Sequence, residues 1–279
     1  MYEHYERPLV IDVSHCDWTG KLSVPAAFDL FMDMAARHAD AMGVGFKDLT
    51  PKHQFWLTVK TRITFYRRPK LLEECTISTE PIRPVAVRGL RDYAITKGDE
   101  VLVRGKTEWV VIDFSTNRLV PQKQVLKEGT EMKPESDDPV PFAKISPDFS
   151  DAQLLGTHTV QSTDIDVGHH MNNAKYLYAL ASMAGTQERE ALEAKSPYVV
   201  EIVFRKPCLE GNELAFYERT LEPEAAPAAG ADAAIAAADS KAEDKAERSD
   251  SIREIGIFNL SDEPGEDGKR APSLLIKIY

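Results

Sequence analysis

Residues 65–71 read FYRRPKL, and residues 203–209 read VFRKPCL. The second stretch lies over the first at an offset of 138 residues, so that Pro69 pairs with Pro207. A match at a fixed offset is a sign of internal duplication, although seven residues alone are a small sample. The elements around the two stretches therefore have to be compared for their order.

The first half is predicted to form a strand, a long helix and then an antiparallel sheet. The helix is expected from about Val24 to Met42, because Ser23 is a suitable N-cap, Pro25 suits the first turn and apolar residues recur at helical spacing. Strand-like runs separated by turn residues follow it. They are FWLTVKTRITFYRRP (55–69), ECTISTEPI (74–82), VRGLRDYAITKG (87–98) and VLVRGKTEWVVID (101–113), with a hairpin turn at KGDE (97–100).

The second half repeats this order. A strand is expected at residues 154–162 and a helix from Asn173 to about Lys195. The four strand-like runs after it are YVVEIVFRKP (198–207), ELAFYERTLE (213–222), SIREIGIFNL (251–260) and SLLIKIY (273–279). The same order on both sides supports a duplication of one α+β unit.

Two segments interrupt the repeats. Residues 127–151 are rich in Pro, Asp and Glu and are predicted to be a linker. Residues 221–250 contain twelve alanines and no aromatic residue, so they are expected to be a low-complexity insertion outside the core. The predicted domains are therefore residues 1–126 and 152–279, with the insertion inside the second.

The composition is typical of a cytoplasmic protein. The first twenty residues have neither an apolar signal core nor a transit-peptide character, and no apolar run approaches the roughly 20 residues that span a bilayer. The three cysteines lie far apart, too few for a disulfide framework and without the close spacing of a zinc site. We expect no membrane partner.

The net charge of −11 argues against general binding to nucleic acid, which needs a basic surface. The basic residues are nevertheless clustered in places. Arg67 with Arg68, and Arg205 with Lys206, could form local positive patches.

Residues 164–173, DIDVGHHMNN, form a dense polar cluster directly before the second predicted helix. Asn172 or Asn173 would make a good N-cap, but capping does not explain Asp164, Asp166, His169 and His170. A helix start carries unpaired N–H groups and a partial positive charge, and it can therefore hold a developing oxyanion. Acid and base groups just upstream would face the reacting centre.

Two other kinds of chemistry are weaker alternatives. His and Asp are common metal ligands, but adjacent histidines point in different directions in an extended segment, and no HExxH or CxxC motif adds ligands. A serine nucleophile is disfavoured because no GxSxG occurs. Cys208 lacks any feature that marks a reactive thiolate. We expect no metal and no cofactor.

The stretch DIDVGHHMNNAKYLYAL (164–180) resembles the signature of the acyl-acyl carrier protein thioesterases, in which an aspartate is followed four residues later by a histidine and then by two asparagines that open a helix. Asp166, His170, Asn172 and Asn173 match that pattern. Three stretches of the first half are also similar to the family: KLSVPAAFDLFMDMAARHADAMGVG (21–45), FWLTVKTRITFYRRP (55–69) and RGKTEWVVID (104–113).

The resemblance implies two tandem hotdog folds, each a long helix wrapped by an antiparallel sheet. It implies hydrolysis of the thioester of a fatty acyl chain on acyl carrier protein, with release of free fatty acid. The partner would be acyl carrier protein with its acyl-phosphopantetheine arm, and the chain would be a monomer or a homodimer. Acyl-coenzyme A hydrolysis and non-catalytic acyl binding are the alternatives.

The chain departs from the family pattern at two places. Gly168 stands where the family usually has an asparagine, and Pro207 or Cys208 stands where it has a glutamate. Either the chemistry uses Asp166 with His170, or the activity is reduced. The first half has Asp17 but no histidine in register, so one reactive site per chain is expected.

Overall fold

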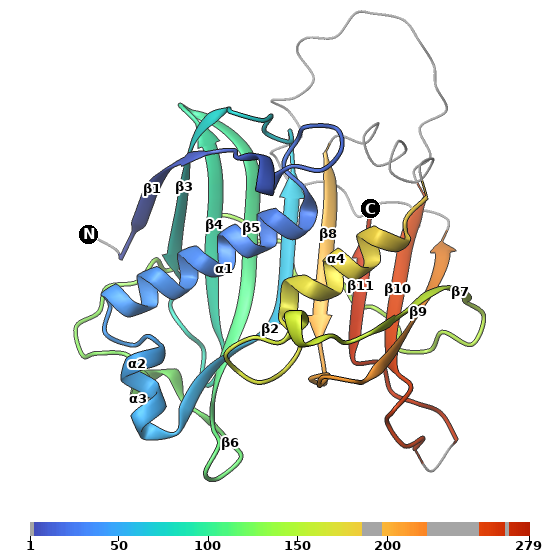
Figure 1. Ribbon diagram of the computed structural model, residues 1–279. Coiled ribbons are helices and arrows are strands. Elements are labelled where there is room, and N and C mark those ends of the chain that lie inside the picture. Colours follow the sequence, from blue (N-terminus) through green and yellow to red (C-terminus); the bar gives the residue numbers. More distant parts are fainter. Residues whose placement is uncertain (1–2, 186–196, 222–250, 266–267) are drawn as a thin grey trace, which may run out of the picture.

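The computed structural model describes residues 3–185, 197–221, 251–265 and 268–279. Its strands form one antiparallel sheet in the order β1-β3-β4-β5-β2-β8-β11-β10-β9-β7, with β6 paired to β5 (Figure 1). The strands are β1 (Tyr5–Val10), β2 (Gln54–Phe65), β3 (Glu74–Pro81), β4 (Gly89–Lys97), β5 (Glu100–Asp113), β6 (Arg118–Val120), β7 (Gln153–Thr159), β8 (Tyr198–Phe204), β9 (Glu213–Leu221), β10 (Ile252–Asn259) and β11 (Leu274–Ile278). Every predicted strand is confirmed, and the hairpin at KGDE joins β4 to β5.

The two halves of the chain have the same strand order when each is read from its own edge of the sheet. The first half runs β1-β3-β4-β5-β2, and the second runs β7-β9-β10-β11-β8. The strands β2 and β8 meet in the middle as an antiparallel pair. The duplication predicted from the sequence is therefore visible in the topology, and the two half-sheets are continuous.

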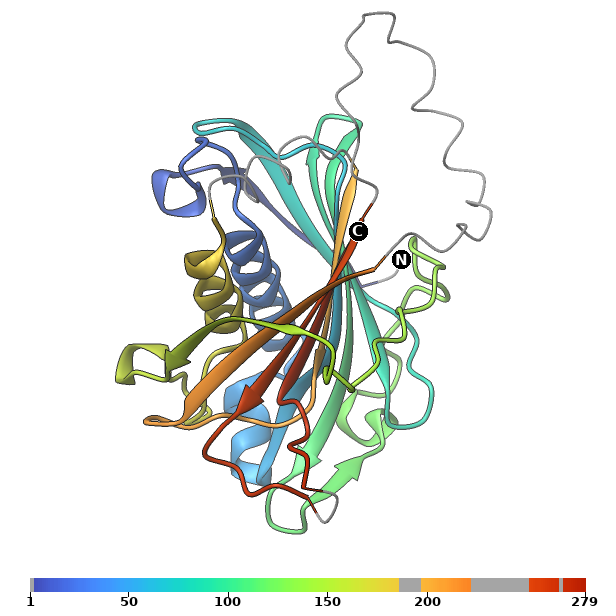
Figure 2. The same ribbon diagram turned by 90° about the vertical axis from the view of Figure 1, so that its right-hand side faces the viewer.

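Helices α1 (Val24–Ala41) and α4 (Asn173–Met183) cover one face of this sheet (Figures 1 and 2). Ser23 caps α1 through its side-chain oxygen, 3.2 Å from the Ala26 nitrogen, and Phe28 and Phe31 are buried in the core. A Cβ at Gly105 of β5 would lie only 2.6 Å from the Phe31 ring, so glycine lets α1 approach the sheet. Two one-turn helices, α2 (Phe46–Leu49) and α3 (Gln122–Val125), lie at one end of the first half.

One sequence prediction needs correction, and another falls on residues that the structure does not describe. The second helix was expected to reach Lys195, but it ends at Met183, and residues 184 and 185 are not helical. Residues 186–196 and nearly all of the predicted insertion lie outside the described residues. The insertion does join two paired strands, because Leu221 at the end of β9 is opposite Ile252 of β10.

The offset between the two repeats is 139 residues in the structure at this point, not 138. In the first half, the N–H groups of Tyr66 and Arg67 both donate to the carbonyl of Leu102, and in the second half those of Arg205 and Lys206 both donate to the carbonyl of Ser273. Tyr66 therefore corresponds to Arg205. The sequence match was displaced by one residue because it aligned the two prolines. Arg68 corresponds to Pro207.

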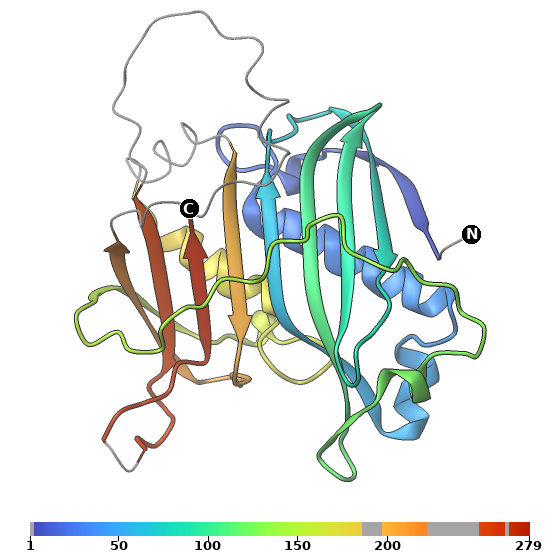
Figure 3. The same cartoon turned by 180° about the vertical axis from the view of Figure 1, so that it is seen from behind.

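A row of charged residues crosses the outer face of the sheet, opposite the helices. Its members are register partners on seven consecutive strands. We call them the charged row: Asp92, Lys106, Arg62, Glu201, Lys277, Glu254 and Arg219. The predicted linker follows this row across the back of the whole sheet (Figure 3). The outer face is thus closed by polar contacts, and the helical face by apolar packing.

The linker is fastened to the charged row by hydrogen bonds along its length. Asp92 accepts from the Ser136 hydroxyl at 2.6 Å and from the Asp137 N–H at 2.8 Å. Farther along, the Phe149 ring packs 4.5 Å from the Arg219 guanidinium. Because both halves contribute to the row, the linker ties them into one body.

Arg62 and Glu201 face each other across the junction of β2 and β8. Arg62 is 4% exposed and Glu201 is 2% exposed, and their closest nitrogen and oxygen atoms are 2.7 Å apart. Glu201 also accepts from the Tyr279 hydroxyl at 2.6 Å and from the Ala143 N–H at 2.7 Å. Arg62 donates further to Asp138 of the linker at 3.0 Å. A buried ion pair of this kind is tolerated because its hydrogen bonds are satisfied.

Glu201→Gln should lower the free energy of unfolding by about 3 kcal/mol, because it leaves Arg62 without its main buried counter-charge. Urea denaturation followed by circular dichroism measures this change. The matched control is Lys47→Met, which breaks the exposed pair with Asp40 and should leave the free energy of unfolding nearly unchanged, because solvent screens that pair. Equal effects of the two substitutions would contradict the role assigned to the junction.

Candidate functional site

The residues before α4 form a tight turn. Ile165 bridges Met171, the Asp166 N–H donates to the His170 carbonyl at 3.0 Å, and the His169 N–H donates back to the Asp166 carbonyl at 3.0 Å. His169 has a φ of 62°, a left-handed conformation that costs a non-glycine residue free energy. The turn brings Asp166 and His170 to the start of the helix.

The first half has the same turn 149 residues earlier. The Asp17 N–H donates to the Lys21 carbonyl at 3.0 Å, and Gly20 takes the left-handed position with a φ of 71°. Asp17 therefore corresponds to Asp166, and Lys21 corresponds to His170. The prediction that the first half has an aspartate but no histidine in register agrees with this geometry.

The two aspartates differ in their partners. Asp17 accepts from the Thr19 hydroxyl with one oxygen and forms an ion pair with Arg68 through the other. Asp166 accepts from the Gly168 N–H at 2.7 Å, and its second oxygen has no hydrogen-bond partner among the described residues. Pro207 takes the place of Arg68, and its side chain has no N–H group that could donate to this oxygen. The charge is neutralised in the first half and left available in the second.

His170 lies beside Asp166. A Cβ at Gly168 would be 3.0 Å from the Asp166 Oδ1 atom and 3.1 Å from the His170 Nδ1 atom, so both groups converge on the space above this glycine. No hydrogen bond joins the two side chains, and the described part of the chain offers the His170 ring no partner. Both groups line a cavity. They are therefore free to bind water or substrate there.

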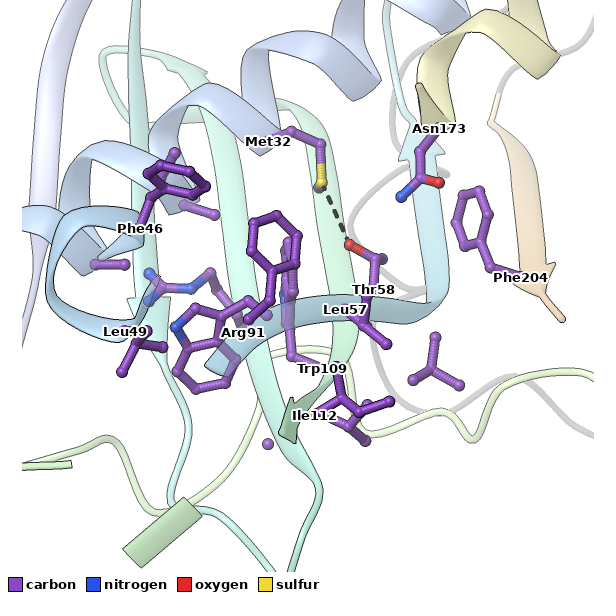
Figure 4. A pocket seen from close by; sticks show the side chains of 18 of the residues that line it. Met32, Phe46, Leu49, Leu57, Thr58, Arg91, Trp109, Ile112, Asn173 and Phe204 are labelled. Carbon is purple, nitrogen blue, oxygen red and sulfur yellow. Dashed lines mark hydrogen bonds between the residues drawn. The ribbon is translucent and has the colours of Figure 1, made fainter. Parts of the chain in front are cut away.

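The start of α4 leaves one backbone donor available. The Asn172 side chain caps the helix by accepting from the Ala174 N–H at 2.8 Å, and the Asn172 carbonyl accepts from Lys175. The Asn173 N–H makes no hydrogen bond to the residues that the structure describes. The Asn173 side chain lines the cavity next to Phe204 (Figure 4). Both asparagines line the cavity, but the Asn172 side chain is engaged as the helix cap, whereas Asn173 offers its backbone N–H.

The other two polar residues of the predicted cluster are not in the cavity lining. Asp164 is buried behind the turn, where it accepts from the Gln161 N–H at 3.0 Å and contacts His158 at 2.8 Å. Burial alone would raise the pKa of Asp164, but these hydrogen bonds lower it. His169 is exposed. Both residues shape the turn, and the chemistry is left to Asp166, His170 and Asn173.

The cavity has a volume of about 1370 Å³ and draws its walls from both halves. Asn173 and Phe204 lie at one end of it, and Phe46 and Leu49 of α2 lie at the other (Figure 4). Between them the walls are mainly apolar side chains of α1, β2 and β5, including Met32, Leu57, Trp109 and Ile112. The reactive groups come from the second half, and most of the apolar chamber comes from the first.

Sequence reasoning missed a buried cation in this chamber. Arg91 of β4 lines the cavity and is 9% exposed, and its Nη1 atom lies 3.0 Å from the Nδ1 atom of His38. The available signal was alternation, since Arg91 has the same inward phase as the buried Tyr93 and Ile95. His38 of α1 is itself buried, at 2% exposed.

Two other sequence expectations can be compared with the structure. Cys208 is fully buried, and burial raises the pKa of its thiol, which disfavours a thiolate nucleophile. The patch predicted at Arg67 and Arg68 is not available, because Arg67 pairs with Glu73 and Glu100 and Arg68 pairs with Asp17. A group of three or more potential metal ligands is absent from the described residues.

Two family models match the chain. The acyl-ACP thioesterase N-terminal domain matches residues 3–130, and the acyl-ACP thioesterase C-terminal domain matches residues 150–252. The chain belongs to the acyl-ACP thioesterase family. The first match covers all the strands of the first half of the sheet, and the second covers β7, β8 and β9 and ends where β10 begins. Residues 131–149 between the two matches belong to the linker that crosses the sheet.

Individual relatives agree with this membership. The chloroplastic acyl-[acyl-carrier-protein] hydrolase FATB3 of Cuphea viscosissima is 22% identical over 206 residues, which are 69% of this chain and 49% of that protein. The chain thus matches about half the length of this curated relative. The part of the chain that the structure describes contains no helix with the length and apolar character needed to cross a bilayer.

Solved structures of thioesterases share the fold. An acyl-ACP thioesterase from Bacteroides thetaiotaomicron superimposes with a TM-score of 0.70 at 15% identity, covering 99% of this chain and 97% of that one. The 12:0-ACP thioesterase from Umbellularia californica gives a TM-score of 0.68 at 15% identity, covering 100% and 97%. The antiparallel sheet with few helices is therefore of the hotdog type seen in this family.

The buried His38 should make the free energy of unfolding of this thioesterase-family protein depend on pH. Burial and the neighbouring Arg91 lower its pKa from 6.5 to about 4. As the pH falls below 6.5, the unfolded chain binds a proton that the folded chain takes up only near pH 4. The free energy of unfolding should therefore fall over this interval, by up to about 3 kcal/mol.

His38→Gln should reduce the fall in the free energy of unfolding between pH 6.5 and pH 4. The measurement is urea denaturation at a series of pH values. The matched control is His53→Asn, a surface position whose left-handed backbone asparagine tolerates. An unchanged slope in the His38 variant would show that other groups cause the pH dependence.

Proposed function

We propose that this chain hydrolyses the thioester of a fatty acyl group carried on acyl carrier protein and releases free fatty acid. The observation that carries the proposal is the unneutralised pair of Asp166 and His170 beside a free helix-start N–H, at one end of an apolar cavity. Membership of the acyl-ACP thioesterase family supports the same reaction.

Thioester hydrolysis needs an activated water, a stabilised oxyanion and a thiolate that leaves without a strong acid. Asp166 and His170 flank one space, so a water held there can lose its proton to either group as it attacks the carbonyl carbon. The Asn173 N–H, at the positive end of α4, is the donor for the oxyanion. Collapse of the tetrahedral intermediate then expels the thiolate of the phosphopantetheine arm.

The repeated strand order supports a division into two hotdog units. We infer an N-terminal unit at residues 1–126, a linker at 127–151 and a C-terminal unit at 152–279 that carries the chemistry. The first unit contributes the acyl chamber. The alternative function is non-catalytic acyl binding. The observation in its favour is that Gly168 and Pro207 carry no side-chain functional group where the family pattern has one.

The carrier is inferred from charge. Acyl carrier protein is strongly acidic, so a protein of net charge −11 needs a local basic surface to capture it. Arg205 and Lys206 line the cavity on the segment next to Phe204. Arg205 has no carboxylate partner among the described residues, and Lys206 makes one long, exposed contact, 3.5 Å from Asp262. They replace Arg67 and Arg68 as the residues expected to meet the carrier.

Asp166→Asn and His170→Ala should each lower kcat by about a hundredfold or more, the usual effect of removing a positioned acid or base. Cys208→Ala is the matched control, because the Cys208 carbonyl accepts from the Met171 N–H of the same turn. It should lower kcat by less than about tenfold, because the buried thiol takes no part. Turnover is measured with purified protein, after circular dichroism has shown that each variant is folded.

The outcomes separate the rival readings. Abolished activity in the Cys208 variant, or an acyl adduct on that thiol, would replace the water mechanism by a covalent one. Near-normal turnover in both the Asp166 and His170 variants would remove the assigned site. No turnover in the unmodified chain, together with tight binding of acyl substrate, would favour the non-catalytic alternative.

Arg205→Glu combined with Lys206→Glu should raise KM for acyl-acyl carrier protein by about tenfold or more at low salt, with a smaller effect on acyl-coenzyme A. Added salt should reduce the difference. Lys144→Glu, an exposed linker position, serves as the charge control. Equal effects on both substrates would mean that the two residues contact the shared phosphopantetheine arm and not the carrier protein.

A further inference from the structure

The cavity has a second opening at the end remote from the reactive groups. Phe46 and Phe114 both line the cavity, yet they are 55% and 56% exposed. Side chains that meet both conditions mark a place where a cavity reaches the surface. Figure 4 shows Phe46 at the opposite end of the chamber from Asn173. A chain bound with its thioester at Asn173 would therefore point toward this opening.

The second opening is bordered by aromatic rings in contact with one another. The Phe46 and Phe55 rings are 5.9 Å apart in an edge-to-face arrangement, and the Phe55 and Phe114 rings are 6.2 Å apart. The Phe114 N–H donates to the His53 carbonyl at 2.9 Å, which fixes the end of β5 against the start of β2. We call Phe46, Phe55 and Phe114 the aromatic rim. It is built on the body of the sheet and on α2.

Basic side chains surround the aromatic rim. Residues 46–53 contain α2, and residues 113–127 contain β6 and α3. The two segments lie together at one end of the molecule (Figure 1). These two segments carry five basic residues, Lys47, Lys52, Arg118, Lys123 and Lys127, against the two acidic residues Asp48 and Asp113. Lys47 pairs with Asp40 of α1, and with that carboxylate included the surface has five basic and three acidic residues, so it is locally positive in a chain of net charge −11. Leu119, 49% exposed on β6, adds to its apolar area.

We propose that the aromatic rim docks on the surface of an anionic lipid bilayer. Exposed aromatic and aliphatic side chains enter the boundary between headgroups and acyl chains, and lysine and arginine side chains beside them contact anionic headgroups. An acidic protein surface would meet the same charges but would not need rings around the mouth of an acyl cavity. Such docking departs from the sequence-based expectation of no membrane partner. That expectation rested on the absence of a bilayer-spanning run, and surface docking requires no such run.

The docking gives the second opening a use. This step rests on the proposed function. The fatty acid released at Asp166 and His170 then already has its hydrocarbon end near the bilayer. It can pass through the aromatic rim into lipid without crossing water. Arg205 and Lys206 also line the cavity and are exposed, so the cavity reaches the surface beside the reactive groups as well. The carrier protein would occupy that opening, so the two partners do not compete for one surface.

Binding is measured by co-sedimentation with sucrose-loaded vesicles in the absence of substrate. One set of vesicles is phosphatidylcholine, and the other contains phosphatidylglycerol in addition, which gives an anionic surface. The unmodified chain should bind the anionic vesicles at least about tenfold more strongly, and salt should weaken the binding. Absence of binding to the anionic vesicles would overturn the proposal.

Variants assign the binding to the rim. Phe46→Ser with Phe114→Ser, Phe114→Ser alone, and Lys52→Glu with Arg118→Glu should each reduce binding, the double variants by about tenfold or more. The matched control is Val13→Ser with Trp18→Ser, which removes equally exposed apolar side chains before α1 and should bind normally. Melting curves show whether each variant is folded.

Two results would contradict the proposal even if the chain binds lipid. Loss of binding in the charge variant alone, with none in the phenylalanine variants, would indicate electrostatic adsorption without docking of the rim. An equal loss in the Val13 and Trp18 control would place the contact elsewhere. Because vesicle binding needs no turnover, Asp166→Asn should bind normally, so failure of the proposed function and failure of docking give different results.

Discussion

The ion pair between Arg62 and Glu201 lies where the two half-sheets become one. A charge taken out of water is stable only with a partner and with its other hydrogen bonds satisfied. Glu201 meets this condition by accepting from Arg62, Tyr279 and the linker N–H of Ala143. The junction therefore requires both halves and the linker at the same time. The register between β2 and β8, and with it the relative position of α1 and α4, depends on this pair.

A fixed junction lets the two copies of one turn diverge in chemistry while keeping their geometry. Both turns have the same backbone hydrogen bonds, and both place an aspartate before a helix. In the first copy Arg68 neutralises Asp17, and the chamber next to that half is apolar. In the second copy Pro207 leaves Asp166 without a cation, and His170 replaces Lys21. One copy has kept the charges paired for stability, and the other has left them available for substrate.

The sequence predicted what depends on local patterns. Capping at Ser23, the strand-like runs between turn residues and the turn at KGDE are all set by neighbours along the chain, and the structure confirms them. The charged row was not foreseen, because each residue in it looks like an ordinary solvent-facing position of an antiparallel strand. Only the register of seven strands and the path of the linker show that Arg62 and Glu201 are buried.

The candidate site shows the same limit. The spacing of Asp166, His170 and the two asparagines identified the turn before α4, but the roles of Asn172 and Asn173 could be divided only from the hydrogen bonds of the helix start. The patch at Arg67 and Arg68 was wrong because the partners Glu73 and Asp17 lie on other elements. The one-residue error between the repeats had a related cause, since the proline match was aligned without the paired N–H groups that fix the true offset.

The division of labour between the halves has a physical reason. A cavity of about 1370 Å³ removes packing from a core, and a half-sheet with one helix has little core to spare. By placing the reactive groups on one half and the chamber in the other, the chain supports the chamber with a sheet that continues beyond it and is closed behind by the charged row. The second half can then keep α4 short, because the stability of its strands comes partly from β2.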